Sequence, residues 1–364
     1  MKKRVMGGLI LLISILLLNG QSGYAFELNG FADVSFTKSM EGADEFRNGD
    51  FAFGALDLYL AQTLDDIDIL VELVVEEGDV LDLERLTLGY TFSDALRLRV
   101  GRFHTPLGFW NTSYHHGVQL QPTIDRPHFL RFEDDGGILP VHVIGGYISG
   151  RAGTAVGAIE YGAMLGNGPR ITSEDGAVNV LHPNNISDNN NSKAIAFNAA
   201  ISPSAIEGLK IGISGHIAEI TSDETVELVN EGNGLTVESL DQMIFGAALT
   251  YSIGNIHLAS EYFSIKDTDN SGATDEDFTS NAYYGLITYT LLDKYVPYFM
   301  YENISVKEND PYFNSLGTAD TREMIAGLRY NINYRSAVKG EYRRIIDIGD
   351  LDWNEYAVQW TLAF

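Results

Sequence analysis

The sequence of 364 residues contains no cysteine. Disulfides, thiolate metal sites and a lipid-acceptor cysteine are therefore excluded. Long apolar runs are also missing after residue 25, because the most apolar later stretch, 69–75, is short and contains Glu72. A membrane helix needs about 20 apolar residues, so the sequence predicts no helical membrane span beyond that point.

Basic residues are scarce, since 24 Lys and Arg stand against 50 Asp and Glu, a formal net charge of −26. This balance argues against nucleic acid as a partner. Averaged over the molecule, it favours attraction of cations and repulsion of anions. Proline is sparse at 9, whereas glycine numbers 37, tyrosine 19 and phenylalanine 18. A chain with so many aromatic residues is expected to fold.

The first 25 residues have the composition of a targeting segment. Basic residues at 2–4 precede an apolar run over 7–18, and Gly23 and Ala25 follow at the usual spacing for cleavage. We expect residues 1–25 to be a secretory signal peptide, removed at maturation, rather than a retained membrane anchor. Its removal leaves 21 basic and 50 acidic residues, a net charge of −29.

The last thirteen residues alternate with period two. The apolar side holds Tyr356, Val358, Trp360, Leu362 and Phe364, and small or polar residues stand between them. Such alternation indicates a strand, and its two faces suit lipid outside and water inside. The stretch resembles the terminal signature of Gram-negative outer-membrane barrels, which typically ends on Phe.

Strand-like runs recur through the rest of the chain. Most have ten or more residues, as tilted membrane strands require, whereas strands of soluble proteins average five or six. The pattern predicts sixteen of them, over 26–37, 50–63, 66–76, 81–92, 95–103, 141–149, 153–165, 193–202, 208–221, 241–253, 255–266, 280–292, 294–306, 322–333, 335–346 and 353–364.

The predicted connections alternate in length. Tight turns such as 63–66, 92–95 and 149–152 are separated by long polar loops, which is typical of outer-membrane barrels. An even strand number lets the first strand pair with the last and leaves no open edge in lipid. We therefore expect 26–364 to form an all-β, closed antiparallel transmembrane barrel of about sixteen strands. The alternative is a soluble sheet protein.

Charges fall on one face of the clearer strands. In 95–103, Arg97 and Arg99 alternate with leucines and a valine. A lipid-facing Arg near the membrane midplane costs ~2–4 kcal/mol, so this face is expected to line the lumen. The runs 193–202 and 280–292 show no clear polar face.

The longest predicted connection, 104–140, is the third outer loop by position. It carries Phe109, Trp110, Tyr114, Phe129 and Phe132, more aromatic residues than a merely solvated loop requires. A barrel of sixteen strands leaves an aqueous channel. We expect this loop to fold inward and form the constriction, as the third outer loop of general porins does.

The stretch Gly101 to Gly108, G-R-F-H-T-P-L-G, resembles the G-x-F-K-x-P-F-G element of the phosphate-selective porin (O and P type) superfamily. The resemblance implies a porin whose basic residues bind phosphate. His104 stands where that element has Lys. The overall acidity favours cations and the resemblance favours anions, so ion selectivity stays open at this stage.

Charged residues near the loop are candidates for lining the constriction. Arg85, Arg97 and Arg99 are predicted on adjacent strands, opposite the loop residues Glu133, Asp134 and Asp135. These groups would produce a transverse field, or the arginines would be neutralised by wall acids. The basic candidates also include His104 and two arginines within the loop, Arg126 and Arg131.

Histidines cluster in and beside the loop, at positions 104, 115, 116, 128 and 142. Histidine is a common zinc ligand, but this spacing matches no metal motif, so structural or pore-lining roles are favoured. Titration of His104 or of the pair His115–His116 would make conductance depend on pH between about 7 and 5.

An acidic segment after residue 266 partly matches a calcium-binding loop. Asp267, Asp269, Ser271, Gly272 and Asp275 occupy positions 1, 3, 5, 6 and 9, but position 12 is Phe278 in place of the usual Glu. We expect either a weak external Ca²⁺ site or a solvated acidic loop, and no other cofactor.

No set of residues suggests catalysis, so we do not expect an enzyme. The sequence predicts an outer-membrane porin that allows passive diffusion of small hydrophilic solutes. Its expected partners are outer-membrane lipid, lipopolysaccharide and, by analogy with other sixteen-stranded porins, two further copies in a homotrimer. The alternative is a non-conducting barrel that serves as a surface anchor, an adhesin or the partner of a periplasmic electron carrier.

Overall fold

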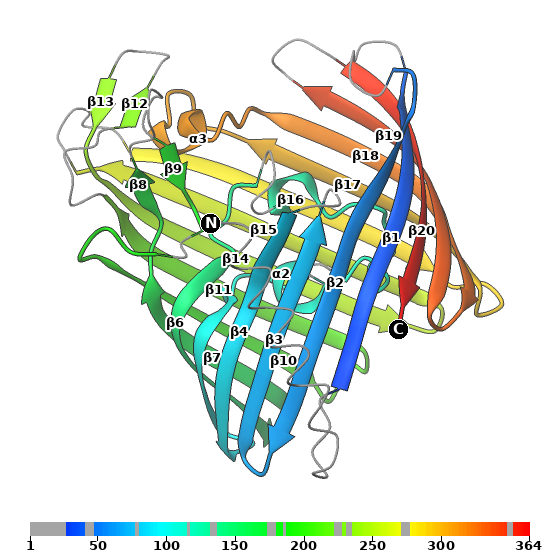
Figure 1. Cartoon of the computed structure of the whole chain (residues 1–364), viewed down its shortest axis with the longest axis horizontal. Coiled ribbons are helices and arrows are strands. Elements are labelled where there is room, and N and C mark those ends of the chain that lie inside the picture. Colours follow the sequence, from blue (N-terminus) through cyan, green and yellow to red (C-terminus); the bar gives the residue numbers. More distant parts are fainter. Residues whose placement is uncertain are drawn as a thin grey trace.

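The computed structural model describes residues 27–40, 47–76, 80–114, 117–131, 137–172, 180–184, 187–221, 228–230, 235–270, 277–347 and 352–364. Within these residues, sixteen strands form one closed antiparallel barrel (Figure 1). The strands are β1(Glu27–Ser39), β2(Asp50–Leu64), β3(Ile67–Glu76), β4(Val80–Ser93), β5(Leu96–His104), β6(His142–Thr154), β7(Gly157–Asn167), β10(Lys193–Pro203), β11(Leu209–Ile220), β14(Leu240–Ile253), β15(Ile256–Asp269), β16(Asp277–Tyr289), β17(Tyr295–Ser305), β18(Thr321–Asn333), β19(Ser336–Asp347) and β20(Asp352–Ala363). The predicted fold class is confirmed.

The barrel is closed by its first and last strands, which lie side by side in Figure 1. β1 pairs with β20 from Phe31–Ala363 to Ser39–Glu355. Inside this seam, the Gln359 amide donates to Asp33 at 2.8 Å. Closure satisfies the backbone groups of both strands, which lipid cannot do.

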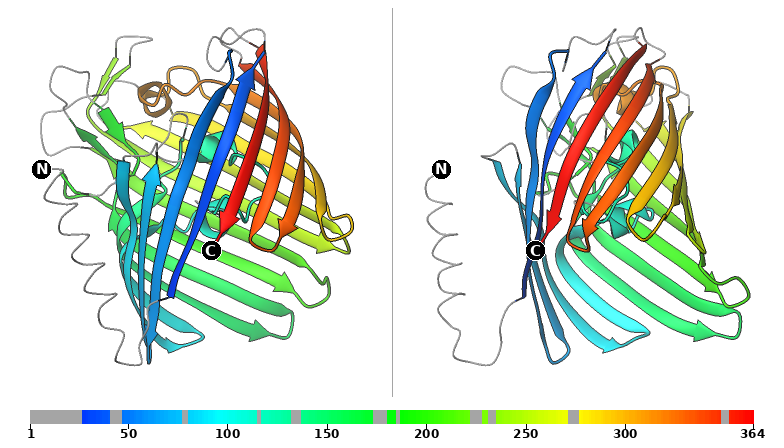
Figure 2. Two further views of the ribbon diagram at one scale, coloured as in Figure 1. Left: turned by 45° about the vertical axis from the view of Figure 1, so that its right-hand side comes forward. Right: turned by 90° about the vertical axis from the view of Figure 1, so that its right-hand side faces the viewer.

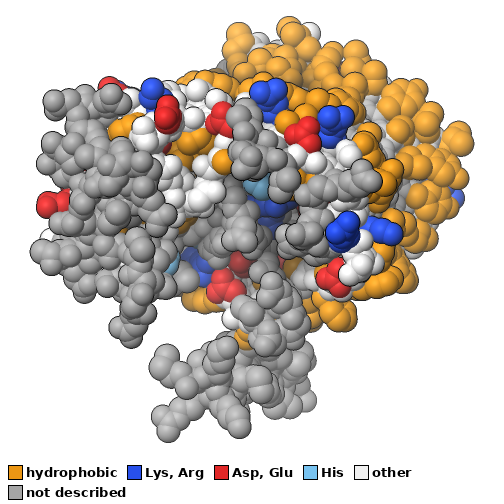
Figure 3. Space-filling model, turned by 90° about the horizontal axis from the view of Figure 1, so that it is seen from above, with side chains coloured by type: hydrophobic (Ala, Val, Ile, Leu, Met, Phe, Trp, Pro, Cys, Tyr) orange, Lys and Arg blue, Asp and Glu red, His pale blue; other side chains and the backbone are white. Residues whose placement is uncertain are grey.

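The outer face of the barrel is apolar. On β20, Tyr356, Val358, Trp360 and Leu362 are exposed, whereas Gln359 and Thr361 between them are buried. The view from above shows hydrophobic side chains over the outer wall and charged side chains at the mouth (Figure 3). An exposed apolar belt around a closed barrel is the surface of a membrane-embedded protein. The fold and the belt together define an outer-membrane β-barrel.

The connections differ between the two ends of the barrel. One end carries tight turns, and the other carries longer segments with further structure (Figure 1). There β8(Arg170–Thr172) pairs with β9(Val180–His182), β12(Leu228–Asn230) pairs with β13(Leu235–Val237), and α3(Pro311–Ser315) forms one helical turn. In the described residues, no helix is long and apolar enough to cross a membrane.

Some predicted strand ends are displaced, most of all around the turn between β6 and β7. The tight turn expected at 149–152 lies at 155–156, because β6 continues through Arg151, which pairs with Glu160 of β7. Glycine and alanine dominate this end of the strand, so apolar alternation is weak there. The loop expected from residue 267 begins after Asp269, because β15 runs to that residue.

Candidate functional site

The segment between β5 and β6 enters the barrel lumen. His104 is the last residue of β5, and the name inward loop is used here for residues 105–141, of which 105–114, 117–131 and 137–141 are described. It contains α2(Trp110–Ser113) and the 3₁₀ turn η1(His128–Leu130). Figure 2 shows it inside the ring of strands. The Thr105 N–H donates to the Val141 carbonyl at 2.6 Å, so the two ends of the loop stay together. The predicted inward fold of the third outer loop is confirmed.

A buried carboxylate on the far wall holds the first part of the loop. Glu261 of β15 accepts the backbone N–H groups of Phe109 and Trp110, at 2.5 and 2.9 Å. The Tyr284 hydroxyl donates to the same carboxylate at 2.8 Å. These bonds require a close approach at Gly108, where φ is +71° and an added Cβ would lie 2.2 Å from Glu261 Oε1. The last glycine of the octapeptide therefore allows the loop to dock.

Wall cations hold the middle of the loop by its carbonyl groups. Lys339 of β19, fully buried, donates to the carbonyls of Val118 and Thr123 at 2.6 and 2.7 Å. Arg329 of β18 donates to those of Gln119 and Gln121 at 2.6 and 2.8 Å. Backbone polar groups buried in a lumen need such partners, and here side chains supply them.

Two further wall carboxylates accept loop amides. Glu341 of β19 accepts the Ile124 N–H at 2.6 Å, and Glu302 of β17 accepts the His128 N–H at 2.7 Å. Arg343 forms ion pairs with Glu341, at 2.6 Å, and with Asp125 of the loop. The loop is therefore docked along β15–β19 by side chains of both signs.

Apolar side chains bury the interface between the loop and this wall. Trp110 and Phe129 of the loop are fully buried and contact Tyr284, and Phe129 also contacts Phe263. Tyr312 of α3 donates its hydroxyl to the Ile138 carbonyl at 2.7 Å. The cluster explains why the run 280–292 showed no polar face in the sequence, since the inner face of β16 packs against the loop.

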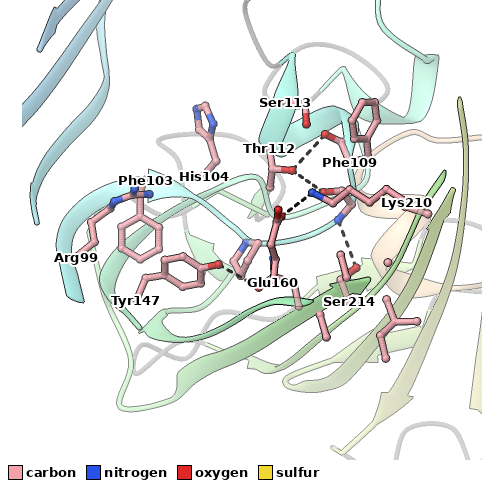
Figure 4. Close-up of a pocket in the computed structure, with 18 of the residues that line it drawn as sticks. Arg99, Phe103, His104, Phe109, Thr112, Ser113, Tyr147, Glu160, Lys210 and Ser214 are labelled. Carbon is pink, nitrogen blue, oxygen red and sulfur yellow. Dashed lines mark hydrogen bonds and ion pairs between the residues drawn. The ribbon is translucent and has the colours of Figure 1, made fainter. Parts of the chain in front are cut away.

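The opposite wall leaves open space. A cavity of about 360 Å³ lies between the inward loop and the inner faces of β3–β7, β10, β11 and β14 (Figure 4). Its charged lining residues are Arg85, Arg99, Glu160 and Lys210. Tyr147, Asn198, Thr112 and Ser113 add polar groups. The lining therefore combines polar and apolar groups, and its charged residues have an excess of positive charge.

The predicted basic residues of the wall lie in different surroundings. Arg99 is exposed in the cavity. Arg85 also lines it but forms an ion pair with the buried Glu72. Arg97 lies at the turn end of β5, where it is 3.6 Å from Asp94, and it is not among the cavity residues. The structure thus separates Arg97 from the other two.

The predicted charges of the loop are only partly described. Glu133, Asp134 and Asp135 lie outside the described residues, so the acidic half of the expected transverse field does too. Arg126 and Arg131 lie near Asp125. Burial acts to raise the pKa of Asp125, but the charges of Arg343, Arg131 and Arg126 lower it below its usual value overall. Within the loop these arginines help to keep Asp125 ionised.

The histidines also have different environments. His115 and His116 lie outside the described residues. Burial, with the nearby charge of Arg131, lowers the pKa of His128 to about 3, so its imidazole is neutral at ordinary pH. His104 and His142 lie opposite each other at the end of the β5–β6 ladder, close to Glu84. Sequence spacing did not reveal this group.

The predicted calcium-binding segment begins inside a strand. Asp267 and Asp269 belong to β15, and the buried Asp267 accepts the Gln242 amide at 3.0 Å. Ser271 and Asp275 lie outside the described residues. Positions 1 and 3 of the predicted calcium loop thus have the extended backbone of a strand. A Ca²⁺ site here stays a prediction.

The residues that dock the loop, and part of the cavity lining, were not among the predicted site residues. Glu261, Glu302, Lys339 and Glu341 were not singled out, nor were Glu160 and Lys210. The available signal was the appearance of charged residues on the inward face of strands. That signal shows which side chains point into the lumen, but not which loop group each of them contacts.

Solved structures with the same fold are outer-membrane proteins. The anion-selective porin from Comamonas acidovorans is 14% identical, with a TM-score of 0.62 over 94% of this chain and 100% of that one. OmpF from Salmonella typhi, in complex with daunomycin, is 15% identical, with a TM-score of 0.62 over 94% and 98%. OmpT of Vibrio cholerae, an outer membrane protein in a trimer form, is 12% identical, with a TM-score of 0.60 over 94% and 100%.

These likenesses establish the fold of an outer-membrane porin. Comparisons with protein-family profiles and with curated protein sequences find no match. The chain is thus a sixteen-stranded outer-membrane β-barrel of porin type with an inward third loop. Membership of the phosphate-selective superfamily stays a prediction.

Proposed function

We propose that this barrel is an outer-membrane porin through which small hydrophilic solutes diffuse passively, without catalysis. The observation that carries the proposal is the one-sided docking of the inward loop. The loop covers β15–β19 and leaves a cavity with charged and polar lining residues against β3–β7, β10, β11 and β14. Solutes would pass along this uncovered wall, with the inward loop as the constriction.

We infer that the passage prefers small anions, phosphate among them. Arg85, Arg99 and Lys210 line the cavity with Glu160. Glu160 pairs with Lys210 at 2.6 Å and Glu72 pairs with Arg85, which leaves Arg99 as the cation outside these ion pairs. The net charge of −29 expected for the mature chain is spread over the whole barrel, and charges beyond about 8 Å are largely screened at physiological ionic strength.

The reversal potential of single channels across a KCl gradient tests this function. The wild-type barrel is expected to conduct and to prefer chloride. Arg99→Glu is expected to move the reversal potential toward that of a cation-selective pore. Arg97→Glu is the matched control, since it makes the same charge change on the same face of β5 but outside the cavity, and is expected to shift selectivity less.

Other outcomes would change the conclusion. A folded barrel that gives no current would favour a non-conducting anchor or adhesin. Equal shifts in the two variants would reject Arg99 as the selective group. A sheath around a folded electron carrier is disfavoured because the inward loop occupies lumen space that such a carrier needs.

The proposal also covers the export of the chain, its surroundings in the membrane and its oligomeric state. Residues 1–25 would direct export as a signal peptide, and the mature barrel would contact lipid and lipopolysaccharide. A homotrimer is supported by the trimer form of the structurally similar Vibrio cholerae protein. Mass measurement of the purified protein in detergent tests the trimer, and the N-terminal sequence of the mature protein tests cleavage after residue 25.

A further inference from the structure

Three residues with metal-binding side chains meet where the inward loop leaves the wall. Glu84 of β4, His104 of β5 and His142 of β6 each place one ligand atom within 4.8 Å of the other two. Glu84 and His142 are 3% exposed, with Glu84 Oε2 2.6 Å from His142 Nε2. The imidazole rings of His104 and His142 have their centroids 5.2 Å apart.

The backbone brings these residues together in two ways. His104 and His142 are directly opposite at the end of the β5–β6 ladder, so their side chains share a face. Glu84 is the extra residue of a bulge, because Glu72 pairs with Arg85 while Leu73 pairs with Leu83. A bulge re-aims side chains, and here Glu84 and Arg85 both turn away from the lipid. Glu84 thereby reaches His142, two strands away.

We propose that Glu84, His104 and His142 bind a divalent transition-metal ion, with Zn²⁺ the best match. Two imidazoles and one carboxylate form a common zinc ligand set, with one further position for water. Tetrahedral zinc ligands lie about 3.3 Å apart, so small side-chain rotations suffice. Mg²⁺ and Ca²⁺ prefer oxygen ligands only. His104 also lines the cavity, which gives an ion a route from the lumen.

Binding would tie the base of the inward loop to the wall. His104 immediately precedes the loop and His142 immediately follows it, while Glu84 belongs to the neighbouring strand. One ion would therefore join both ends of the loop to β4. This site is independent of which solutes the barrel conducts.

Metal titration of the untagged full-length mature barrel, refolded in detergent and freed of metal, tests the proposal. Calorimetry with ZnCl₂ is expected to show one saturable ion per chain. Glu84→Gln and His104→Gln are each expected to weaken binding about tenfold or more. His257→Gln, which changes a histidine of β15 outside the cluster, is the matched control and is expected to bind as the wild type does.

A second probe keeps the test valid if a variant misfolds. Co²⁺ added to the wild-type barrel is expected to give the intense visible absorption of a four-coordinate ion, and Zn²⁺ is expected to abolish it. The absence of saturable Zn²⁺ uptake, uptake unchanged in both variants, or only the weak absorption of six-coordinate Co²⁺ would overturn the proposal. The Glu84–His142 contact would then be a structural ion pair.

Discussion

Glu261 of β15 accepts the backbone N–H of Trp110 at 2.9 Å across the lumen, although 151 positions separate the two residues in the chain. The carboxylate is 1% exposed, and a buried carboxylate is costly unless it is hydrogen-bonded. The docked loop supplies two of the three hydrogen-bond donors to Glu261, and Tyr284 supplies the third. The wall therefore stabilises the inward loop, and the loop in turn makes this wall stable.

Glu261→Gln is expected to loosen the first part of the inward loop. The neutral amide is a weaker acceptor than the carboxylate, and its NH₂ group would meet loop amides that also donate. Loss of two charge-assisted bonds costs on the order of 3 kcal/mol of docking free energy. Single-channel recordings should show a larger or noisier conductance, and trypsin should cut faster after Arg131.

The control for that variant is Glu207→Gln, which removes the same charge in an exposed turn. It should leave both conductance and proteolysis at wild-type values. Unchanged behaviour of Glu261→Gln would mean that its three hydrogen bonds do not hold the loop.

Gly108→Ala is expected to displace the loop more severely. The residue has φ of +71°, and its new Cβ would lie 2.2 Å from Glu261 Oε1 and 2.8 Å from the Phe263 ring. Backbone strain and the clash together should lower the free energy of unfolding by on the order of 1–3 kcal/mol. Gly146→Ala on β6 meets nothing within 4 Å and is the matched control. Urea unfolding and trypsin cleavage measure both effects, and equal stability of the two variants would contradict the expected clash.

Acidification is expected to release the loop through His128. The docked residue has a pKa of about 3 because of burial and the charge of Arg131, whereas a solvated histidine has a pKa of about 6.5. The released loop therefore binds a proton first, so docking weakens as pH falls from about 6.5 toward 3 and is unaffected above that range. Within this window, each unit of pH changes the equilibrium constant for docking of the loop by up to about tenfold.

Conductance between pH 7 and 4 measures this response. His128→Gln removes the titration and should give a flatter profile, whereas His257→Gln should respond as the wild type does. Profiles that coincide in all three proteins would exclude His128 and leave the acid response to other groups.

The sequence predicted the barrel well because lipid imposes a simple rule on each strand. The sixteen predicted runs match the sixteen barrel strands to within about five residues at each end, including the closing strand that ends at Ala363. Alternation is absent where the inner face of a strand meets protein in place of water. The inner face of β16 carries Tyr284 and Leu286 against the inward loop, so both of its faces are apolar and no alternation is visible.

The site was less accessible to sequence reasoning. The aromatic residues of the third outer loop correctly predicted that it folds inward. Its docking partners, such as Lys339, could not be found, since alternation says only that a side chain points inward. Glu84 was hidden for another reason. A bulge changes which face of the sheet the neighbouring side chains occupy. The period-two pattern does not show where a bulge occurs.

The inward loop gives the two halves of the barrel separate tasks. Residues of β15–β19 meet the loop, whereas residues such as Arg99 and Lys210 meet the solvent of the cavity. If the barrel conducts as proposed, changes at Arg99 or Lys210 would alter what it admits and leave the docking contacts of β15–β19 in place. Under that proposal, evolution or engineering would change the selectivity of the barrel by single substitutions of exposed lining residues.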